Sequence, residues 1–438
     1  MVGGVALLAL GLAACTPATD AQSSTALDQF FNTEEIHSID VQFDDADYQE
    51  MLESFSDTGD KNWISADVTI DGVTYENAGL RLKGNSSLQS LRRGASQSAA
   101  VNEGDGTIDA EDPSSLPWLI RLDKYVDGQT HSGRARFVIR GNDTASSLSE
   151  AVALAMLQEA DVPTQQFAFT AFTVNGSAGR LRLTVDLPDD ALWNDDEFGG
   201  TGYTYKAEST GNYQYHGDSA EDYVDVFEQK FGDDDMQPLI DFIDFINNSS
   251  DEEFAANIGN YLEVDEFARY LAMQNLVNNF DDISGPGNNS YLHYSPETGK
   301  MTVVSWDHNL AFGMTPGGNP GGEPPEGMPG DGMGEPPQMP GGAGPGGQTP
   351  GGMNATDNPL VTRLEALDDF AATLEQTQNE LAAELITSGR AEEILNSYVA
   401  LLTSQGGDLI SVADVESDAA SISSQLSADP RQTQPDAA

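Results

Sequence analysis

Apolar and polar positions alternate over short stretches in the first half of the chain, a pattern typical of β-strands. Turn-forming pairs such as Asp71-Gly72 and Asn175-Gly176 separate some of these stretches and indicate hairpins. Strands are therefore expected at 36–43, 66–75 (two strands), 78–83, 118–125, 167–174 and 179–187.

Helical spacing dominates the second half. Apolar residues recur every three or four positions over 220–247 and 252–278, which predicts mainly helical structure there. Two more helices are expected within 360–412. In the first half, a short helix is expected at 45–54, and residues 147–160 predict one notable helix with a Ser cap.

Two other stretches carry no such pattern. Gly, Pro and Met dominate residues 314–359, a composition that cannot pack a core. Residues 94–115 are polar and rich in turn-forming residues, which predicts a mobile loop. A flexible tail is expected over 413–438.

One predicted hairpin lies within the helix-rich half. Its arms are Tyr291–Tyr294 and Met301–Ser305, and its turn is the SPETGK segment at 295–300. Folding the hairpin about its turn brings Asn289 beside Asp307. Two oxygen ligands that are distant in the sequence thereby become neighbours.

A carboxylate pair, Asp281 and Asp282, stands just upstream of this hairpin. Oxygen ligands on a rigid hairpin suit Mg²⁺, which proteins usually hold with few groups of their own plus substrate phosphates. The order of a base Asp, a metal-binding Asn and a metal-binding Asp matches the working parts of a phosphoryl transferase. Capping of turns by Asp and Asn is the structural alternative, and for Asp282 it is as plausible as chemistry.

Composition limits the partners of this chain. Acidic residues number 72 against 19 basic ones, a net charge of −53, which argues against nucleic-acid binding and polybasic membrane contact. At 38% hydrophobic residues, the chain can still bury a core. Basic residues are scarce enough to be informative, and those singled out in the first half are Lys83, Arg121, Lys124, Arg140 and Lys206.

The N-terminus has the features of a targeting segment. Val5–Ala14 is apolar but too short to span a membrane. It ends in Leu-Ala-Ala-Cys15, which resembles the bacterial lipobox, where the Cys is acylated. Cys15 is the single cysteine, which excludes internal disulfides and Cys-based metal sites. We expect a lipoprotein signal peptide at 1–14, a tether at 15–30 and a lipid-anchored, extracytoplasmic protein of the cell envelope; a plain signal peptide is the alternative.

An ordered set of motifs carries a resemblance that extends over roughly residues 36 to 395. They are LRLKGNSS (80–87), IRLDKY (120–125), SLSEAVALAML (147–157), VNG (174–176), YTYKAE (203–208), NFDDISGPGNNSYLHY (279–294), WDHNLAFG (306–313) and NPLVTR (358–363). Together they resemble the CotH-type kinases, secreted relatives of the protein-kinase fold. A Gly-rich insert after the WD motif is also common in that family.

The resemblance implies an α+β, two-lobed, atypical protein-kinase-like fold over residues 31–412. Its β-rich N-terminal lobe would occupy about 31–215 and its helix-rich C-terminal lobe, with the metal-binding hairpin, about 216–412. The implied activity is transfer of the ATP γ-phosphate to a Ser/Thr hydroxyl of a secreted or surface protein. The implied cofactors are ATP and Mg²⁺, with Mn²⁺ as a substitute, and we expect a monomer.

The resemblance also implies roles for acidic and amide residues. Asp281, or its neighbour Asp282, would be the catalytic Asp, while Asn289 and Asp307 would bind metal. The family commonly has W-D-x-D where this chain has Trp306-Asp307-His308-Asn309. Asn309 keeps an oxygen ligand at the second metal position but lacks the charge.

The ATP-binding end is less complete, since the chain has no G-x-G-x-x-G loop. Lys83 and the turn Gly84-Asn85-Ser86 are candidates for holding phosphate through backbone N–H groups and hydroxyls. Arg121 or Lys124 would be the phosphate-pairing base, with Glu150 as its ion-pair partner, and Lys206 is a further ATP-pocket candidate.

Two other functions remain open. A non-catalytic, pseudokinase-like scaffold or an adhesion or matrix protein would explain the missing Gly-rich loop and the change to Asn309. The other is a related transferase that uses ATP for a different modification, such as the transfer of AMP or glutamate.

Overall fold

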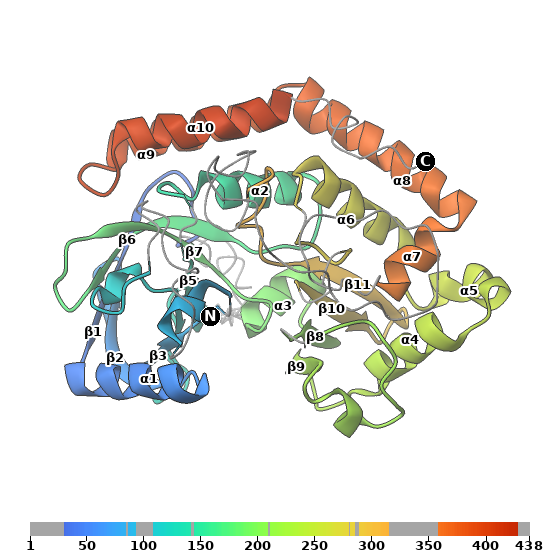
Figure 1. The fold of residues 1–438 in the computed structure, drawn as a ribbon, viewed down its shortest axis with the longest axis horizontal. Coiled ribbons are helices and arrows are strands. Elements are labelled where there is room, and N and C mark those ends of the chain that lie inside the picture. The colour runs from blue at the N-terminus through green and yellow to red at the C-terminus, as the bar shows by residue number, and fades with distance from the viewer. Residues whose placement is uncertain are drawn as a thin grey trace, which may run out of the picture.

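The computed structural model describes residues 30–84, 86–92, 108–141, 144–208, 211–279, 281–284, 289–314 and 358–427. Within these residues the protein is a mixed α+β structure with a β-rich N-terminal region and a helix-rich C-terminal region (Figure 1). Cys15, Asn85 and residues 315–357 of the expected insert lie outside the described part, as does the side chain of Ser86.

Seven strands of the N-terminal region close into a barrel with the order β1-β2-β3-β4-β5-β7-β6. Closure comes from parallel pairing of β6 with β1. The strands are β1 (His37–Phe43), β2 (Ile64–Ile70), β3 (Val73–Leu82), β4 (Trp118–Arg121), β5 (Arg136–Ile139), β6 (Phe167–Val174) and β7 (Arg180–Val185). Helix α1 (Asp45–Thr58) packs on β2.

Alternation along the strands creates two cores. Inward side chains such as Val68, Leu80 and Ile120 are fully buried and form a core inside the barrel. Outward side chains such as Leu119 and Val138 join a second core that continues into the C-terminal region. Because successive strand residues point to opposite sides, Arg81 on β3 points away from the core that Leu80 and Leu82 enter, and Lys83 follows directly after the strand.

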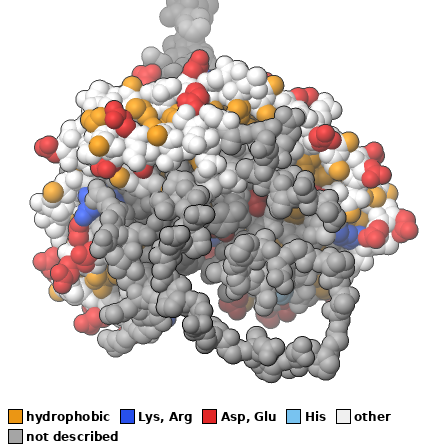
Figure 2. Space-filling view, turned by 45° about the horizontal axis from the view of Figure 1, so that its top comes forward, with side chains coloured by type: hydrophobic (Ala, Val, Ile, Leu, Met, Phe, Trp, Pro, Cys, Tyr) orange, Lys and Arg blue, Asp and Glu red, His pale blue; other side chains and the backbone are white. Residues whose placement is uncertain are grey.

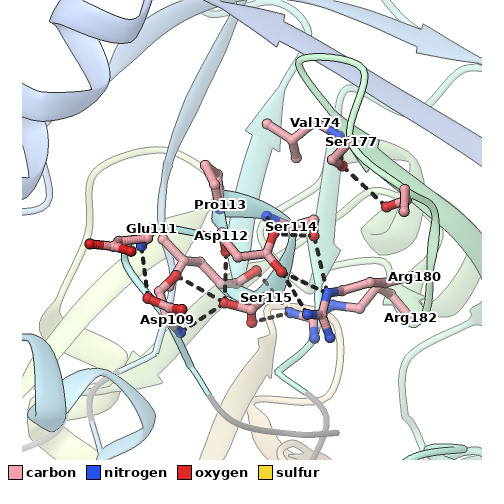
Figure 3. A network of polar contacts seen from close by, with 12 residues as sticks. Asp109, Glu111, Asp112, Pro113, Ser114, Ser115, Val174, Ser177, Arg180 and Arg182 are labelled. Carbon is pink, nitrogen blue, oxygen red and sulfur yellow. Dashed lines mark hydrogen bonds and ion pairs between the residues drawn. The ribbon is translucent and has the colours of Figure 1, made fainter.

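A polar network fixes the segment that leads into β4 (Figure 3). Arg182, only 2% exposed, donates to the carbonyls of Ser115 and Leu116 at 2.8 and 2.9 Å. Arg180 pairs with Asp112 at 2.6 Å. The segment continues to Pro117, whose carbonyl accepts the Lys83 N–H at 3.1 Å, so the network also supports the end of β3.

The second sheet has the order β11-β10-β8-β9. Its strands are β8 (Tyr203–Ala207), β9 (Phe227–Phe231), β10 (Ser290–Ser295) and β11 (Lys300–Ser305). Helix α2 (Leu148–Glu159) lies between the barrel and the C-terminal helices and is buried from Leu148 to Leu157. A helix that is apolar nearly all round belongs in a core.

The remaining helices are α3 (Ala191–Phe198), α4 (Gln237–Asn248), α5 (Asp251–Asn257), α6 (Val264–Leu276), α7 (Pro359–Glu365), α8 (Asp368–Leu381), α9 (Arg390–Gln405) and α10 (Val412–Ser427). In Figure 1, α8, α9 and α10 run along the top, above α6 and α2. Contacts of α8 with α6, and of α9 and α10 with α2, agree with this view.

Most predicted strands are confirmed, with some differences. The strand expected at 78–83 is the continuation of β3, because the chain passes Asn77 in a left-handed conformation (φ 55°) without leaving the sheet. Strand β9 lies within 220–247, which was predicted to be mainly helical; its pairing with β8 outweighs the local pattern. The short strand β5 and helix α3 were not predicted.

The C-terminal part holds more helix than the sequence pattern indicated. Helices α7, α8 and α9, with a π-helical stretch at Ala382–Thr387, replace the two helices expected in 360–412. Helix α10 occupies 412–427, where we expected a flexible tail. Its buried residues Val415, Ile422 and Leu426 pack into the main core.

The surface reflects the composition. Figure 2 shows acidic side chains spread over the described part of one face and few basic ones, as the net charge of −53 requires. Within the described residues, we find no helix with the length and apolar character needed to cross a membrane.

Candidate active site

The predicted hairpin is confirmed as β10–β11. Tyr291 pairs with Val304 and Tyr294 with Met301, and the last pair at the open end is Ser290 with Ser305. This register places Asn289 one residue before that pair and Asp307 two residues after it. Both side chains thus emerge at the same end of the sheet.

Asn289 and Asp281 are joined directly. The Asn289 side-chain amide donates to the Asp281 carboxylate at 2.8 Å and to the Asp281 carbonyl at 2.9 Å. Burial raises the pKa of Asp281 to about 6, the nearby Asp307 carboxylate adds to this rise, and the bond from Asn289 opposes it. Asp281 is therefore a carboxylate poised to accept a proton near neutral pH.

Asp307 has an unusual backbone. Its φ is +69°, in the left-handed region that few residues other than Gly adopt. Burial alone would raise its pKa, but an ion pair with Arg140 outweighs burial and the pKa is lowered. Asp307 therefore stays ionised, and its strained geometry at this position suggests a functional constraint.

Arg140 connects Asp307 to helix α2. Its guanidinium contacts Asp307 and also binds Glu150, with both Nε and Nη2 lying 2.9 Å from Glu150 oxygens. Arg140 is 12% exposed and Glu150 is 6% exposed. The two acids outweigh burial and raise the pKa of Arg140, so the guanidinium is a permanent cation.

The expected pairing of Glu150 with Arg121 or Lys124 is wrong, because Glu150 pairs with Arg140 instead. Arg140 was noted from the sequence as a scarce base but was not assigned to the site. It follows the short strand β5, which the sequence pattern did not reveal, and it stands 10 residues before Glu150. A base just after a strand that leads into a buried helix with a Glu in its first turn is the signal that identifies it in retrospect.

Arg121 and Lys124 lie elsewhere. Arg121 lies opposite Gly79 of β3, three residue pairs along the β3–β4 ladder from the pair Leu82–Trp118. Its guanidinium pairs with Asp123 at 2.7 Å. Lys124 lies 5.2 Å from the ring of Trp63. The base beside the end of β3 that carries Lys83 is instead Arg140, which follows the pair Trp118–Ile139.

Lys83 lies beside Trp306, the residue that precedes Asp307 of the candidate site. Its Nζ lies 5.4 Å from the Trp306 ring centroid, and the Arg140 guanidinium carbon lies 5.9 Å from the same ring. Burial lowers the Lys83 pKa to about 7; Asp189 opposes this, and nearby Lys206 strengthens it. Gly84 follows with φ +105°, and a Cβ there would collide with the Ser87 hydroxyl, so the turn requires Gly.

Lys206 approaches from the second sheet. Its Nζ lies 5.8 Å from the Tyr291 ring, and that ring packs 5.5 Å from Trp306. Burial lowers its pKa. The Tyr291 hydroxyl donates to Asp189 at 3.0 Å. Lys83 and Lys206 therefore reach the same aromatic pair from the barrel and the second sheet.

Asp282 serves its own turn. It is 7% exposed and accepts the Ser284 N–H at 2.8 Å. The backbone of Ile283, the next residue, is bound on both sides. Its N–H donates to the Tyr270 hydroxyl at 3.3 Å, and its carbonyl accepts from the Asn358 amide at 2.9 Å. Of the two carboxylates, Asp281 is the one joined to Asn289.

His308 and Asn309 follow Asp307 in the chain. His308 is fully buried, and burial lowers its pKa to about 4. Its Nε2 lies 2.8 Å from the Ser305 hydroxyl and 3.2 Å from the Gln274 amide nitrogen, which can only donate. His308 therefore packs as a neutral ring, and Asn309 begins the turn that follows it.

The donor set fits a hard divalent cation. Asp281 and Asp307 interact as like charges, so a cation would relieve their repulsion, and Asn289 offers an amide oxygen beside them. Carboxylate and amide oxygens with room for phosphates are typical of Mg²⁺ sites. No group of three or more His, Cys, Asp or Glu suited to a metal occurs in the described residues, so this would be a two-carboxylate site completed by substrate.

A family model described as CotH kinase protein matches residues 82–408. The chain therefore belongs to the CotH kinase family, a family of atypical protein kinases. The match includes Lys83, Arg140, Glu150, Asp281 and Asp307, and it ends before helix α10. Membership in this kinase family implies ATP as a substrate. No curated protein matches the chain.

Proposed function

We propose that this protein transfers the ATP γ-phosphate to a Ser or Thr hydroxyl of a protein outside the cytoplasm. The barrel region and the helix-rich region would act as two lobes around the nucleotide. The observation that carries the proposal is the joining of Asp281, Asn289 and Asp307 at one end of the second sheet to Arg140 and Glu150 at the barrel.

Asp281 would orient the acceptor hydroxyl and take its proton. The hydroxyl oxygen forms a bond to the γ-phosphorus as the bond to the bridging oxygen breaks, and ADP leaves. With its pKa raised to about 6 by burial and by Asp307, Asp281 is ionised at neutral pH yet basic enough to accept a proton.

Arg140 and Lys83 would contact the phosphates. Glu150 fixes the Arg140 guanidinium from the α2 side, so its orientation does not depend on the ligand. Asn289 and Asp307 would hold Mg²⁺, or Mn²⁺, which when bound neutralises charge on the phosphates. Catalysis then consists mainly of positioning and charge stabilisation.

The test combines ATP binding with transfer. Purified protein should be stabilised against heat by ATP with Mg²⁺ and should gain phosphoryl groups or pass them to an added protein. Asp281→Asn should retain binding and lose transfer. The absence of any shift with ATP and Mg²⁺ would remove the basis for the kinase mechanism.

Two observations favour a second candidate, a nucleotide-binding scaffold without transfer. The Asp307 carboxylate is already engaged by Arg140, and the neighbouring position carries Asn309 rather than an acid. Both features weaken the attraction for a second cation. Binding of ATP without any transfer of phosphate would support this function.

The cellular setting is also a proposal. The lipobox-like segment ending at Cys15 supports a lipid-anchored protein of the cell envelope that faces outward. We propose separately that the protein acts as a monomer. Its acceptors would then be secreted or surface proteins. Metabolic labelling with a fatty-acid analogue, compared with Cys15→Ala, tests the anchor independently of activity.

A further inference from the structure

Helix α2, which carries Glu150, begins at an unusual N-terminus. Ser147 precedes the helix with φ +54°, and its side chain makes no capping bond, contrary to the Ser cap predicted from the sequence. Instead the Ser146 hydroxyl accepts the Leu148 N–H at 3.2 Å. Ser146 is fully buried, so the start of α2 depends on what holds Ser146.

Ser146 is held by Asp418 of helix α10, 272 residues later in the sequence. The Asp418 carboxylate accepts the Ser146 N–H at 3.0 Å and the Ser146 hydroxyl proton through the same oxygen. A carboxylate at a helix N-terminus also interacts favourably with the helix dipole. Asp418 thus acts on α2 as a cap supplied from another part of the chain.

Asp418 occupies the packed side of α10. Val415 and Ile422, one helical turn before and after it, are buried, and residues three and four apart share a helix face. Helix α10 contacts α2 and α9, and Figure 1 shows α10 above α2. Asp418 itself is half-buried, and Ser146 is its hydrogen-bond partner on this side of the helix.

The same helix reaches the other side of the candidate site. A Cβ on Gly313, at the end of the WDHNLAFG segment, would lie 4.0 Å from the Gln425 side-chain oxygen. Gly313 in turn donates its N–H to the Asn278 carbonyl at 3.1 Å. Helix α10 therefore lies against both segments that meet at Arg140: α2 with Glu150, and the segment with Asp307.

We infer that α10 is a positioning element of the kinase site, and that Asp418, through Ser146, sets the start of α2 so that Glu150 holds Arg140 against Asp307. This role lies beyond the family match, which ends at residue 408. Its kinetic test rests on the proposed kinase function. Asp418 is a positioning residue and touches no reacting group.

The matched variants are Asp418→Asn and Asp414→Asn. Asp414 lies on the same helix but binds Ser411 at the helix's own start, at 2.6 Å. We expect Asp418→Asn to lower kcat about tenfold and to leave KM for ATP within about twofold, whereas Asp414→Asn keeps the wild-type kcat. Ser146→Ala should give at least as large a fall, because it removes both the hydroxyl that accepts the Leu148 N–H and the bond of that hydroxyl to Asp418.

A double-mutant cycle separates positioning from general destabilisation. If Asp418 acts through Glu150, the combined Asp418→Asn, Glu150→Gln variant should be no slower than Glu150→Gln alone. Rates that fall by the product of the two single effects would overturn the inference. So would an unchanged kcat for Asp418→Asn.

Hydrogen exchange gives a readout that needs no activity. In the full-length protein, Asp418→Asn should speed exchange at the Leu148 amide, and Asp414→Asn should not. Equal protection of this amide in both variants would contradict the contact. If the wild-type protein transfers no phosphate, the proposed function fails, while the exchange experiment still decides whether Asp418 sets the start of α2.

Discussion

Arg140 and Asp307, 167 residues apart in the sequence, are joined by an ion pair, and Glu150 holds the same guanidinium from helix α2. Arg140 comes directly after strand β5 of the barrel, while Asp307 follows strand β11 of the second sheet. This relationship connects the two regions at the residues assigned to chemistry. It makes Arg140 the central basic residue of the candidate site.

Replacement of Arg140 tests its role in both stability and activity. Arg140→Gln leaves Glu150 and Asp307 without their shared cation, and breaking a buried ion pair costs about 3–5 kcal/mol of unfolding free energy. Arg140→Lys keeps the charge but loses the planar guanidinium that contacts Glu150 and Asp307 together. This variant should therefore be more stable than Arg140→Gln and should still transfer phosphate, at a reduced rate. Denaturant unfolding and initial rates measure the two effects.

Arg121→Gln is the matched control for Arg140. Arg121 is a partly exposed strand Arg paired with Asp123, so its loss should change stability by no more than about 0.5 kcal/mol. Activity should remain near that of the wild type. A large loss of activity in Arg121→Gln with little effect of Arg140→Lys would reverse the assignment of the phosphate contact.

We predict that the Lys83 amine takes up a proton when nucleotide binds. Burial lowers its pKa to about 7 in the free protein, and a bound phosphate favours the charged amine and raises that pKa. At pH 8 the amine is mostly neutral before binding and charged afterwards. Calorimetry in buffers with different ionisation enthalpies should therefore show proton uptake, and Lys83→Arg, which stays protonated, should not.

The lowered pKa of Lys83 also determines how the free energy of unfolding changes with pH. The unfolded chain holds the Lys83 proton up to a pKa near 10.4, while the folded protein releases it near 7. Between these values the unfolded state binds more protons, so the Lys83 contribution to stability increases as pH rises from 7 toward 10. Lys83→Met should flatten this part of the stability profile; an unchanged slope would argue against the lowered pKa.

Asp307→Asn isolates the charge of the proposed metal ligand. Asn tolerates the left-handed backbone that this position adopts, so the variant should fold. Loss of one carboxylate weakens the attraction for a divalent cation, and thermal stabilisation by ADP should no longer depend on Mg²⁺. Asp282→Asn serves as the control, because Asp282 caps its own turn and should retain the Mg²⁺ dependence.

Local patterns explain which features could be predicted from the sequence. The β10–β11 hairpin was predicted with its arms and turn because pairing between neighbouring segments is recorded in their alternation and turn residues. The same hairpin brought Asn289 and Asp307 to one end of the sheet. The sequence placed Asp281 and Asp282 just upstream of this hairpin as alternatives, and the structure shows that Asp281 is the one that binds Asn289.

The missed features depend on contacts between distant segments. Strand β5 has four residues, too few for a clear period, so Arg140 after it was not recognised as part of the site. Helix α10 looked like a polar tail, because its buried residues are spaced among Ser, Asp and Ala. Its stability comes from packing on α2 and α9, which no local pattern records.

Intact-mass analysis of the protein after incubation with ATP and Mg²⁺, alone and with an added acceptor protein, tests the central claim most directly. We predict that the wild type adds phosphoryl groups to itself or to the acceptor, and that Asp281→Asn and Asp307→Asn do not. Equal phosphorylation by both variants and the wild type, or addition of the mass of AMP in place of phosphate, would contradict the kinase mechanism.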